Sequence, residues 1–430
     1  MLYFFCFRAA CRPSAALALS VVFFTGAHAQ PLQTTLPADS PPTATATAPR
    51  SSPSLRLALE AAWALSPAAR SADSRRAEIQ ARARAAASWI NGAPGATLAQ
   101  RSDRFSANRG FREYEAELEL PLWSPGVRGA TQRELLARRL NFAPQQLVAR
   151  LKLAAEVREL AASLAIARTE RDLAERKHSE ARALAQDVER RVKAGDTARV
   201  DSLQAQSQVA QAASGSEQAG AALKRLQNQW LALTGLAEAP PLDEALPPRS
   251  ALANPDHPVV QAAQAQVQTA QAKLELTEAD KRDPMSLGVG VTRERATFGA
   301  TGETSLRLAL KIPFGGDNRN GPRIAAARAE LDAAQAEADA VVRQTRHELA
   351  SASAGLDAAR RIEATMAERA RLGQEVQALV AKAFRLGESD LPTRLRADNE
   401  KFEADLSLAR ARIGTQRATS QLNQALGLLP

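Results

Sequence analysis

The stretch EYEAELELPLW, from Glu113 to Trp123, alternates between charged and apolar residues at almost every step. Its carboxylates occupy one parity: Glu113, Glu115, Glu117 and Glu119. Its apolar residues occupy the other: Tyr114, Ala116, Leu118, Leu120 and Leu122. A period of two residues predicts a β-strand with one charged face and one apolar face. The two faces of this strand therefore need different surroundings.

A second stretch, TSLRLALKIPF at 304–314, has the same pattern. Leu306, Leu308, Leu310, Ile312 and Phe314 alternate with Ser305, Arg307, Ala309 and Lys311. Each of these two strands follows a polar loop and a weaker strand pattern, within 90–99 and at 286–291. The sequence therefore predicts four strands per chain.

The rest of the chain is typical of long helices. Of 430 residues 45% are hydrophobic but only 4% aromatic, and alanine supplies much of the apolar content. Such a composition favours close-packed helices over a thick globular core. The formal net charge is +9, but acidic and basic residues interleave and no Lys/Arg block contains aromatic residues. We therefore expect no nucleic-acid binding.

The N-terminus has the pattern of a secretory signal peptide, assigned to residues 1–29. Arg8 and Arg12 precede a short apolar run that leads to Ala27-His28-Ala29, which predicts cleavage before Gln30. Residues 30–53 are rich in Pro, Thr and Ser and are expected to be a disordered linker. Cys6 and Cys11 lie in the part removed, so the mature chain has no thiol or disulfide. No later apolar run is long enough for a membrane helix, so membrane insertion would have to use the strands.

Apolar residues step by three and four along a segment expected to be one helix from Val127 to Lys193. They form a coiled-coil-like seam at Leu153, Val157, Leu160 and Leu164. At ~1.5 Å per residue this helix would measure ~100 Å, and Pro144 should kink it or mark its true beginning. Gly195 suits the residue beyond the helix end, and Asp196 or Thr197 suits the next N-cap. The following helix, to about Thr234, carries one apolar stripe: Leu223, Leu226, Trp230 and Leu233.

The pattern then repeats with one offset. Pro121 and Pro313, Gly195 and Gly387, and Gly235 and Gly427 are each separated by 192 residues. Three landmarks at one spacing indicate an internal duplication. We assign residues 54–238 to the first repeat, 239–250 to a linker, and 251–430 to the second repeat.

The apolar face of the strands must be shielded from water. A soluble protein would pack it on the helices, but helices of ~100 Å with their own seam cannot fold over a small sheet. Strands cross bilayers only in closed barrels, with the apolar side outward. Lipid would then face Leu118, Leu120, Leu122, Leu308 and Leu310. Water in the lumen would face Glu113, Glu115, Glu117, Glu119, Arg307 and Lys311. Since four strands cannot close a barrel, three subunits would supply twelve.

The chain resembles the TolC-like outer-membrane efflux proteins over roughly residues 54–430. The resemblance is carried by the strand-to-helix junctions LELPLWSPGVRG and LALKIPFGGDNRNG and by the helical hairpins RVKAGDTARVDSLQAQ and FRLGESDLPTRLRADNE. It implies a mainly α fold with a small β part, in a homotrimeric duct. A long periplasmic α-helical barrel would continue a twelve-stranded outer-membrane β-barrel in a Gram-negative bacterium.

Within that family, IPFGGDNRNGPRIAAARAELDAA is most similar to the heavy-metal (cobalt–zinc–cadmium) branch. The resemblance implies a passive exit duct, with a periplasmic adaptor and an inner-membrane pump of the RND type as partners. The adaptor would dock on two exposed turns, Gly195-Asp196 and Gly387-Glu388. Where the first hairpin has the family's usual aspartate, Asp201, the second has Thr393, preceded by an unusual Pro392. Pro121 and Pro313 would mark the joints between strand and tunnel helix.

No catalytic or metal-binding motif is present. His178, His257 and His347 are far apart in sequence and no pair has i, i+4 spacing, so neither a transition-metal site nor a cofactor is expected. No nucleophile–base set or phosphate-binding loop occurs, so we expect no enzyme. Drug efflux or type I protein secretion would use the same architecture. A periplasmic adaptor or a structural coiled-coil protein is the alternative of another class.

Overall fold

The computed structural model describes residues 54–247, 257–314 and 317–430. All of them lie in one compact unit, Ser52–Pro430. The predicted signal peptide and the 30–53 linker fall outside the described residues, as does the end of the predicted 239–250 linker.

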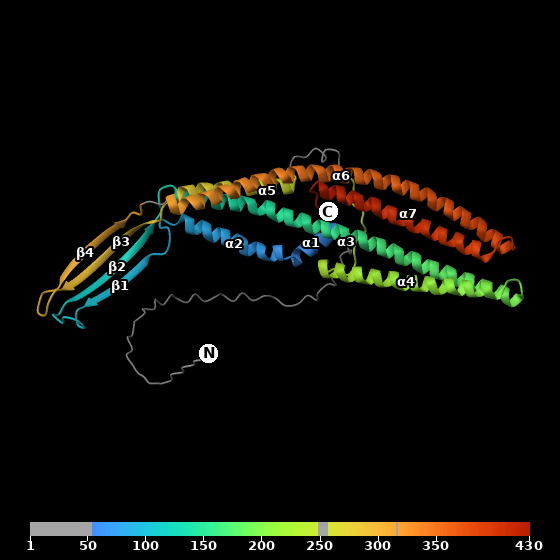
Figure 1. Ribbon diagram of the computed structural model, residues 1–430, viewed down its shortest axis with the longest axis horizontal. Coiled ribbons are helices and arrows are strands. Elements are labelled where there is room, and N and C mark those ends of the chain that lie inside the picture. The colour runs from blue at the N-terminus through green and yellow to red at the C-terminus, as the bar shows by residue number, and fades with distance from the viewer. Residues whose placement is uncertain (1–53, 248–256, 315–316) are drawn as a thin grey trace, which may run out of the picture. The chain divides into compact units, whose positions relative to one another are not determined.

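The described chain is mostly helical, with one small sheet (Figure 1). The first repeat contains α1 (Leu55–Leu65), α2 (Pro67–Ala87), β1 (Gly95–Ser102), β2 (Arg112–Leu122), α3 (Val127–Ala194) and α4 (Arg199–Thr234). The second contains α5 (Pro258–Ala279), β3 (Met285–Arg295), β4 (Glu303–Lys311), α6 (Asp317–Leu386) and α7 (Leu391–Ala425). The expected element order is confirmed in both repeats, and α3 and α6, with 68 and 70 residues, are each ~100 Å long.

The four strands form one antiparallel sheet in the order β1-β2-β3-β4. The pairing of β2 with β3 joins the two repeats. Its register places Glu117 opposite Gly290 and Leu118 opposite Val289. The four strands expected from the alternation are confirmed, and β3 extends four residues beyond the expected Val291 because Arg293 and Arg295 continue the pairing with Tyr114 and Arg112.

Helix packing uses the predicted seams. α3 packs on α4 and α6 on α7 as two hairpins, and α3 also contacts α2, α5 and α7. Val157 and Leu164 of α3 and Trp230 of α4 are almost fully buried in one cluster, which Leu153 and Leu160 border. Many buried positions are alanines, which allow the helix axes to approach closely. The seam in α3 and the stripe in α4 are thus confirmed as core.

Two local expectations about helix ends need correction. Pro144 lies inside α3, which begins at Val127 as the pattern predicts. Asn141, three residues before it, donates to Gln266 of α5 over 2.8 Å, so a tertiary contact holds the helix close to the proline. The N-cap of α4 is Ala198, without a side-chain bond, rather than Asp196 or Thr197.

The second hairpin has the better cap. Asp390 caps α7 by accepting from the backbone N–H of Thr393 over 3.0 Å. Pro392 lies in the first turn of α7, where the missing N–H costs nothing. The proline that departs from the family's pattern therefore fits the helix start.

Candidate functional site

The sheet has one charged and one apolar face. In antiparallel strands, directly paired residues point to the same side. Glu117, Gly290 and Arg307 form one such row, and Leu118, Val289 and Leu308 the next. The charged residues of the charged face are Arg101, Glu113, Glu115, Glu117, Glu119, Glu294, Glu303, Arg307 and Lys311. The apolar face carries Leu98, Ala116, Leu118, Leu120, Leu122, Leu287, Val289, Val291, Leu306, Leu308 and Leu310.

On the inner strands the apolar face is the more exposed one. Tyr114 and Leu118 are 48% and 45% exposed, whereas the side chains of Glu113 and Glu115 are 21% and 27% exposed. On the edge strands the charged residues Arg101 and Arg307 are exposed as well, at 79% and 62%. In the described ranges, no helix packs over either face of the sheet. We infer that the difference on the inner strands comes from curvature, since side chains crowd on a concave side and spread on a convex one. On this basis the charged face is the concave one and the apolar face the convex one.

Glycines in β3 make room on the concave side. A Cβ built on Gly288 would lie 2.6 Å from Oε1 of Glu117, and one on Gly290 would lie 3.5 Å from the Glu117 Cβ. The Glu117 side chain therefore lies across β3 at these two glycines. Arg101 pairs with Glu113 at 3.3 Å on the same face.

Aromatic residues flank the apolar face at both ends. Tyr114, Phe105 and Phe298 lie at the end that carries the loops, with Phe105 98% exposed. Trp89 and Phe314 lie at the end that joins the helices. All five aromatic side chains are exposed. Water-soluble proteins usually avoid exposing so many large aromatic side chains around one face.

Among the described residues the sheet also has two open edges, because β1 and β4 each pair on one side only. Open edges invite pairing with another chain. The predicted joint residues lie near strand ends. Pro121 is the residue before the last one of β2, and Pro313 follows the end of β4 by two residues. Both positions lack an N–H to offer to a neighbour.

The two hairpin turns have the same backbone geometry. Gly195 and Gly387 have φ values of +83° and +76°. The N–H of Asp196 donates to Arg191 O, and that of Glu388 to Ala383 O, each over 2.9 Å. Both turns are thus Schellman motifs, in which glycine avoids the strain of a side chain at positive φ. Gly195, Asp196, Gly387 and Glu388 are all exposed.

The two turns are joined by side chains behind them. Phe384 of α6 is buried with Val188 of α3, Ala205 of α4 and Leu391 of α7. Arg191 lies over the Phe384 ring at 4.8 Å and donates to the Phe384 carbonyl over 3.3 Å. The two predicted docking turns therefore belong to one packed unit.

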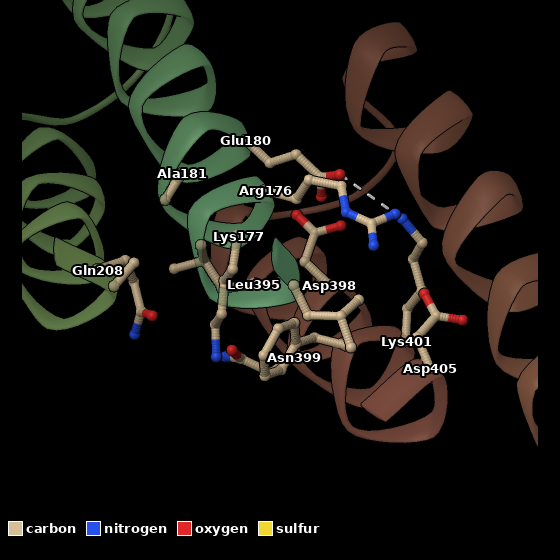
Figure 2. A pocket seen from close by; sticks show the side chains of 13 residues that line it. Arg176, Lys177, Glu180, Ala181, Gln208, Leu395, Asp398, Asn399, Lys401 and Asp405 are labelled. Carbon is tan, nitrogen blue, oxygen red and sulfur yellow. Dashed lines mark ion pairs between the residues drawn. The ribbon is translucent and has the colours of Figure 1, made fainter. Parts of the chain in front are cut away.

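Ion pairs connect α3 and α7 above these turns. Glu159, Glu170 and Glu180 of α3 pair with Arg417, Arg410 and Lys401 of α7, at 2.7, 2.6 and 3.8 Å. All carboxylates lie on one helix and all cations on the other. Figure 2 shows the last pair beside a cavity of about 70 Å³ between α3, α4 and α7. There Lys177 lies 4.4 Å from the centre of the Phe402 ring.

Two polar contacts, one buried and one half-buried, were not expected from the sequence. Arg158 of α3 donates to both carboxylate oxygens of Glu244, over 2.9 and 2.6 Å, and to Gln424 of α7 over 2.6 Å. His257 caps α5, with Nδ1 accepting from the N–H of Val259 over 3.3 Å. Burial lowers the pKa of this imidazole, against opposing effects of Glu348 and of a hydrogen bond with the Ala425 backbone. The partners of Arg158 are 86 and 266 residues away, so no local sequence signal could have found them.

No group of three His, Cys, Asp or Glu side chains suited to a metal ion occurs in 54–247, 257–314 and 317–430. Within the same ranges, none of the helices has the length and apolar character needed to cross a membrane.

A family model described as outer membrane efflux protein matches residues 248–428. A search among curated proteins gave no match. Among solved structures, a membrane protein from Pseudomonas aeruginosa is 21% identical, with a TM-score of 0.70 over 87% of this chain and 90% of that one.

The outer membrane protein VceC from Vibrio cholerae is 16% identical, with a TM-score of 0.69 over 87% of this chain and 96% of that one. The open state of the MtrE outer membrane channel from Neisseria gonorrhoeae is 17% identical, with a TM-score of 0.69 over 87% of this chain and 89% of that one. The family model is described as an efflux protein, and the MtrE structure is described as a channel. The described chain has the same fold as the outer membrane proteins VceC and MtrE, and its residues 248–428 match the outer membrane efflux protein family.

Proposed function

We propose that three copies of this chain form an exit duct in the outer membrane of a Gram-negative bacterium. The observation that carries this proposal is the curved sheet, with its convex apolar face and two open edges. Pairing the β1 edge of one copy with the β4 edge of the next removes every open edge in a ring of twelve strands. The convex face then meets lipid, and the concave charged face lines water.

The size of the apolar face supports this arrangement. From Tyr114 to Leu122, β2 covers about 26 Å at ~3.3 Å per residue. Even when tilted by ~40°, such a strand covers most of the ~25 Å apolar band of an outer-membrane barrel. The aromatic residues at both ends of the face correspond to the two interfacial girdles of such barrels.

We infer that the duct works with a periplasmic adaptor and an inner-membrane pump of the RND type. The turns at Gly195-Asp196 and Gly387-Glu388 are exposed and joined behind by the Phe384 cluster. Six such turns in a trimer would offer a ring on which an adaptor can dock. The chain itself would be a passive conduit.

For the cargo we propose heavy-metal cations. Six carboxylates and three cations occupy the charged face, which gives a net charge of minus three per chain. A lumen of that sign raises the local concentration of cations. The metal would be cargo in transit, without a fixed site in the chain.

The test is expression of the full precursor in a strain that lacks its own ducts. The protein should fractionate with the outer membrane as a trimer and restore export together with a matching pump and adaptor. Recovery as a soluble periplasmic monomer would indicate an adaptor or a structural coiled coil. Export of drugs or of a protein, but not of metal ions, would correct the cargo alone.

A further inference from the structure

The apolar face ends, on the side of the loops, in a group of three arginines. Arg112 of β2 is paired directly with Arg295 of β3, and Arg293 lies two residues from Arg295 on the same face. Arg112 and Arg293 are exposed. The direct pairing of two like charges across strands is destabilising without an anionic partner.

The protein supplies no such partner in the part of the chain described. None of the three arginines forms an ion pair there. Arg295 donates from Nε to the carbonyl of Gly110 over 3.4 Å and lies 6.0 Å from the centre of the Phe298 ring. Both contacts orient its guanidinium but leave the charge uncompensated.

Charge is also sorted across the sheet at this end. The concave side carries Glu113, Glu294 and Glu303, with Arg101 paired to Glu113. The convex side carries only arginines. A surface that serves only solubility usually mixes positive and negative side chains. The unmixed cations on the convex side therefore suggest that they contact a partner outside the barrel and not the water of the lumen.

A shallow hollow adjoins the arginines on the convex side. Its volume is about 420 Å³, and it is lined by Leu98, Ala99, Gln100, Tyr114, Glu115, Ala116, Val291 and Arg293, of which Ala99 and Glu115 belong to the opposite face by their pairing. Most of these side chains are apolar, and Arg293 lies at the rim nearest the loops. An apolar hollow with a cation at one end matches a lipid, whose acyl chain and charged headgroup need these two surroundings.

We propose that Arg112, Arg293 and Arg295 bind the phosphate groups of a phosphorylated outer-leaflet lipid, with one acyl chain in the adjoining hollow. This inference rests on the proposed function, because the loops 103–111 and 296–302 then face the cell exterior. Guanidinium groups hold phosphate oxygens through two parallel hydrogen bonds. The bound phosphates would also relieve the repulsion between Arg112 and Arg295.

The test uses the detergent-purified trimer and native mass spectrometry with four added probes: bis-phosphorylated lipid A, the same lipid without its phosphates, phosphatidylethanolamine, and inorganic phosphate. The variant is R112Q/R293Q/R295Q. The matched control, R101Q/R307Q/K311Q, removes three cations from the concave side. Trimer yield and heat-resistant migration verify the assembly of both.

The wild-type trimer and the control should bind bis-phosphorylated lipid A in preference to the other three probes. The variant should bind it on the order of 100-fold more weakly, since each basic residue near an anionic surface contributes about fivefold. Three results would overturn the inference without contradicting the proposed trimer: equally weakened lipid binding in the control, unchanged lipid binding by the variant, or equal binding of the phosphate-free lipid. A chain that never enters the membrane would overturn the proposed function as well.

Discussion

Arg307 and Glu115 occupy equivalent positions in the two repeats, 192 residues apart, and the Arg307 Nη1 lies 3.4 Å from the Glu115 Oε1. Their strands, β4 and β2, are not neighbours, because β3 runs between them. The contact is possible because Gly290, paired with Arg307, has no side chain to block the path. The duplicated position has thus taken opposite charges that meet on the concave face.

A single charge should distinguish the two faces of β4. We expect Leu308→Arg to destabilise the inserted barrel by about 2–4 kcal/mol, the cost of an arginine at the bilayer midplane. Its matched control is Ala309→Arg, one residue on, which places the same side chain on the concave side and should cost little. Glu117→Gln should likewise leave assembly nearly unchanged. Denaturant titration of trimers folded into vesicles measures the difference, and equal losses for Leu308→Arg and Ala309→Arg would reverse the assigned orientation.

The charged face should make the pore prefer cations. The net charge of minus three per chain comes largely from Glu113, Glu115, Glu117 and Glu119, while Arg307 and Lys311 offset part of it. Reversal potentials in planar bilayers under a salt gradient should therefore show cation selectivity. Replacing the four glutamates with glutamine should remove it, and R307Q/K311Q should increase it. If the wild-type pore shows no preference between cations and anions, the charged face of the sheet does not select ions by charge.

The sequence predicted the strands, the long helices and their turns because these depend on local periods and on glycine at positive φ. Gly195, Gly235, Gly387 and Gly427, all found at offsets of 192, all have positive φ. The N-cap at Ala198 was missed because the Schellman turn engages the Asp196 N–H and moves the helix start onward. Arg158 and Glu244 are 86 residues apart, and their contact depends on how the linker returns to α3.

Breaking the Arg158 contact should destabilise the junction between the repeats. The side chains of Arg158 and Glu244 are only 5% and 11% exposed. Arg158→Ala leaves a buried carboxylate without its partner, which costs about 3–5 kcal/mol. R158M/E244Q removes both charges and should cost less than the single change, as unfolding of detergent-purified trimers can show. A double variant as unstable as Arg158→Ala would mean that packing, rather than charge burial, explains the loss.

His257 should make stability depend on pH. Burial lowers its pKa, so the folded state favours the neutral imidazole, whose Nδ1 caps α5. The stabilisation is present above the unfolded pKa of about 6.5 and is lost as the pH falls through the lower folded pKa. Glu348 and the Ala425 backbone limit the shift. His257→Asn retains a capping oxygen that does not titrate, so its melting temperature should fall less between pH 7 and pH 5; parallel curves for both proteins would contradict this.

The hairpin turns provide the most direct test of partner docking. A Cβ at Gly195 or Gly387 would meet nothing within 4 Å, so a larger residue has room and costs only the strain of positive φ, roughly 1 kcal/mol. Gly195→Arg and Gly387→Arg should therefore leave trimers in the outer membrane at near-normal abundance. If the turns dock an adaptor, each change should abolish efflux, because a long cation disturbs the ring of exposed turns.

Gly→Ala at the same positions is the matched control, since it adds the same backbone strain without bulk or charge. We expect it to retain most of the efflux. The first turn should be the more sensitive, because Asp201 follows it whereas Thr393 occupies the corresponding region of the second hairpin. Efflux is measured as resistance in a strain without any other duct. Full resistance with both glycines replaced by arginine would rule out docking at the turns and leave them as helix reversals.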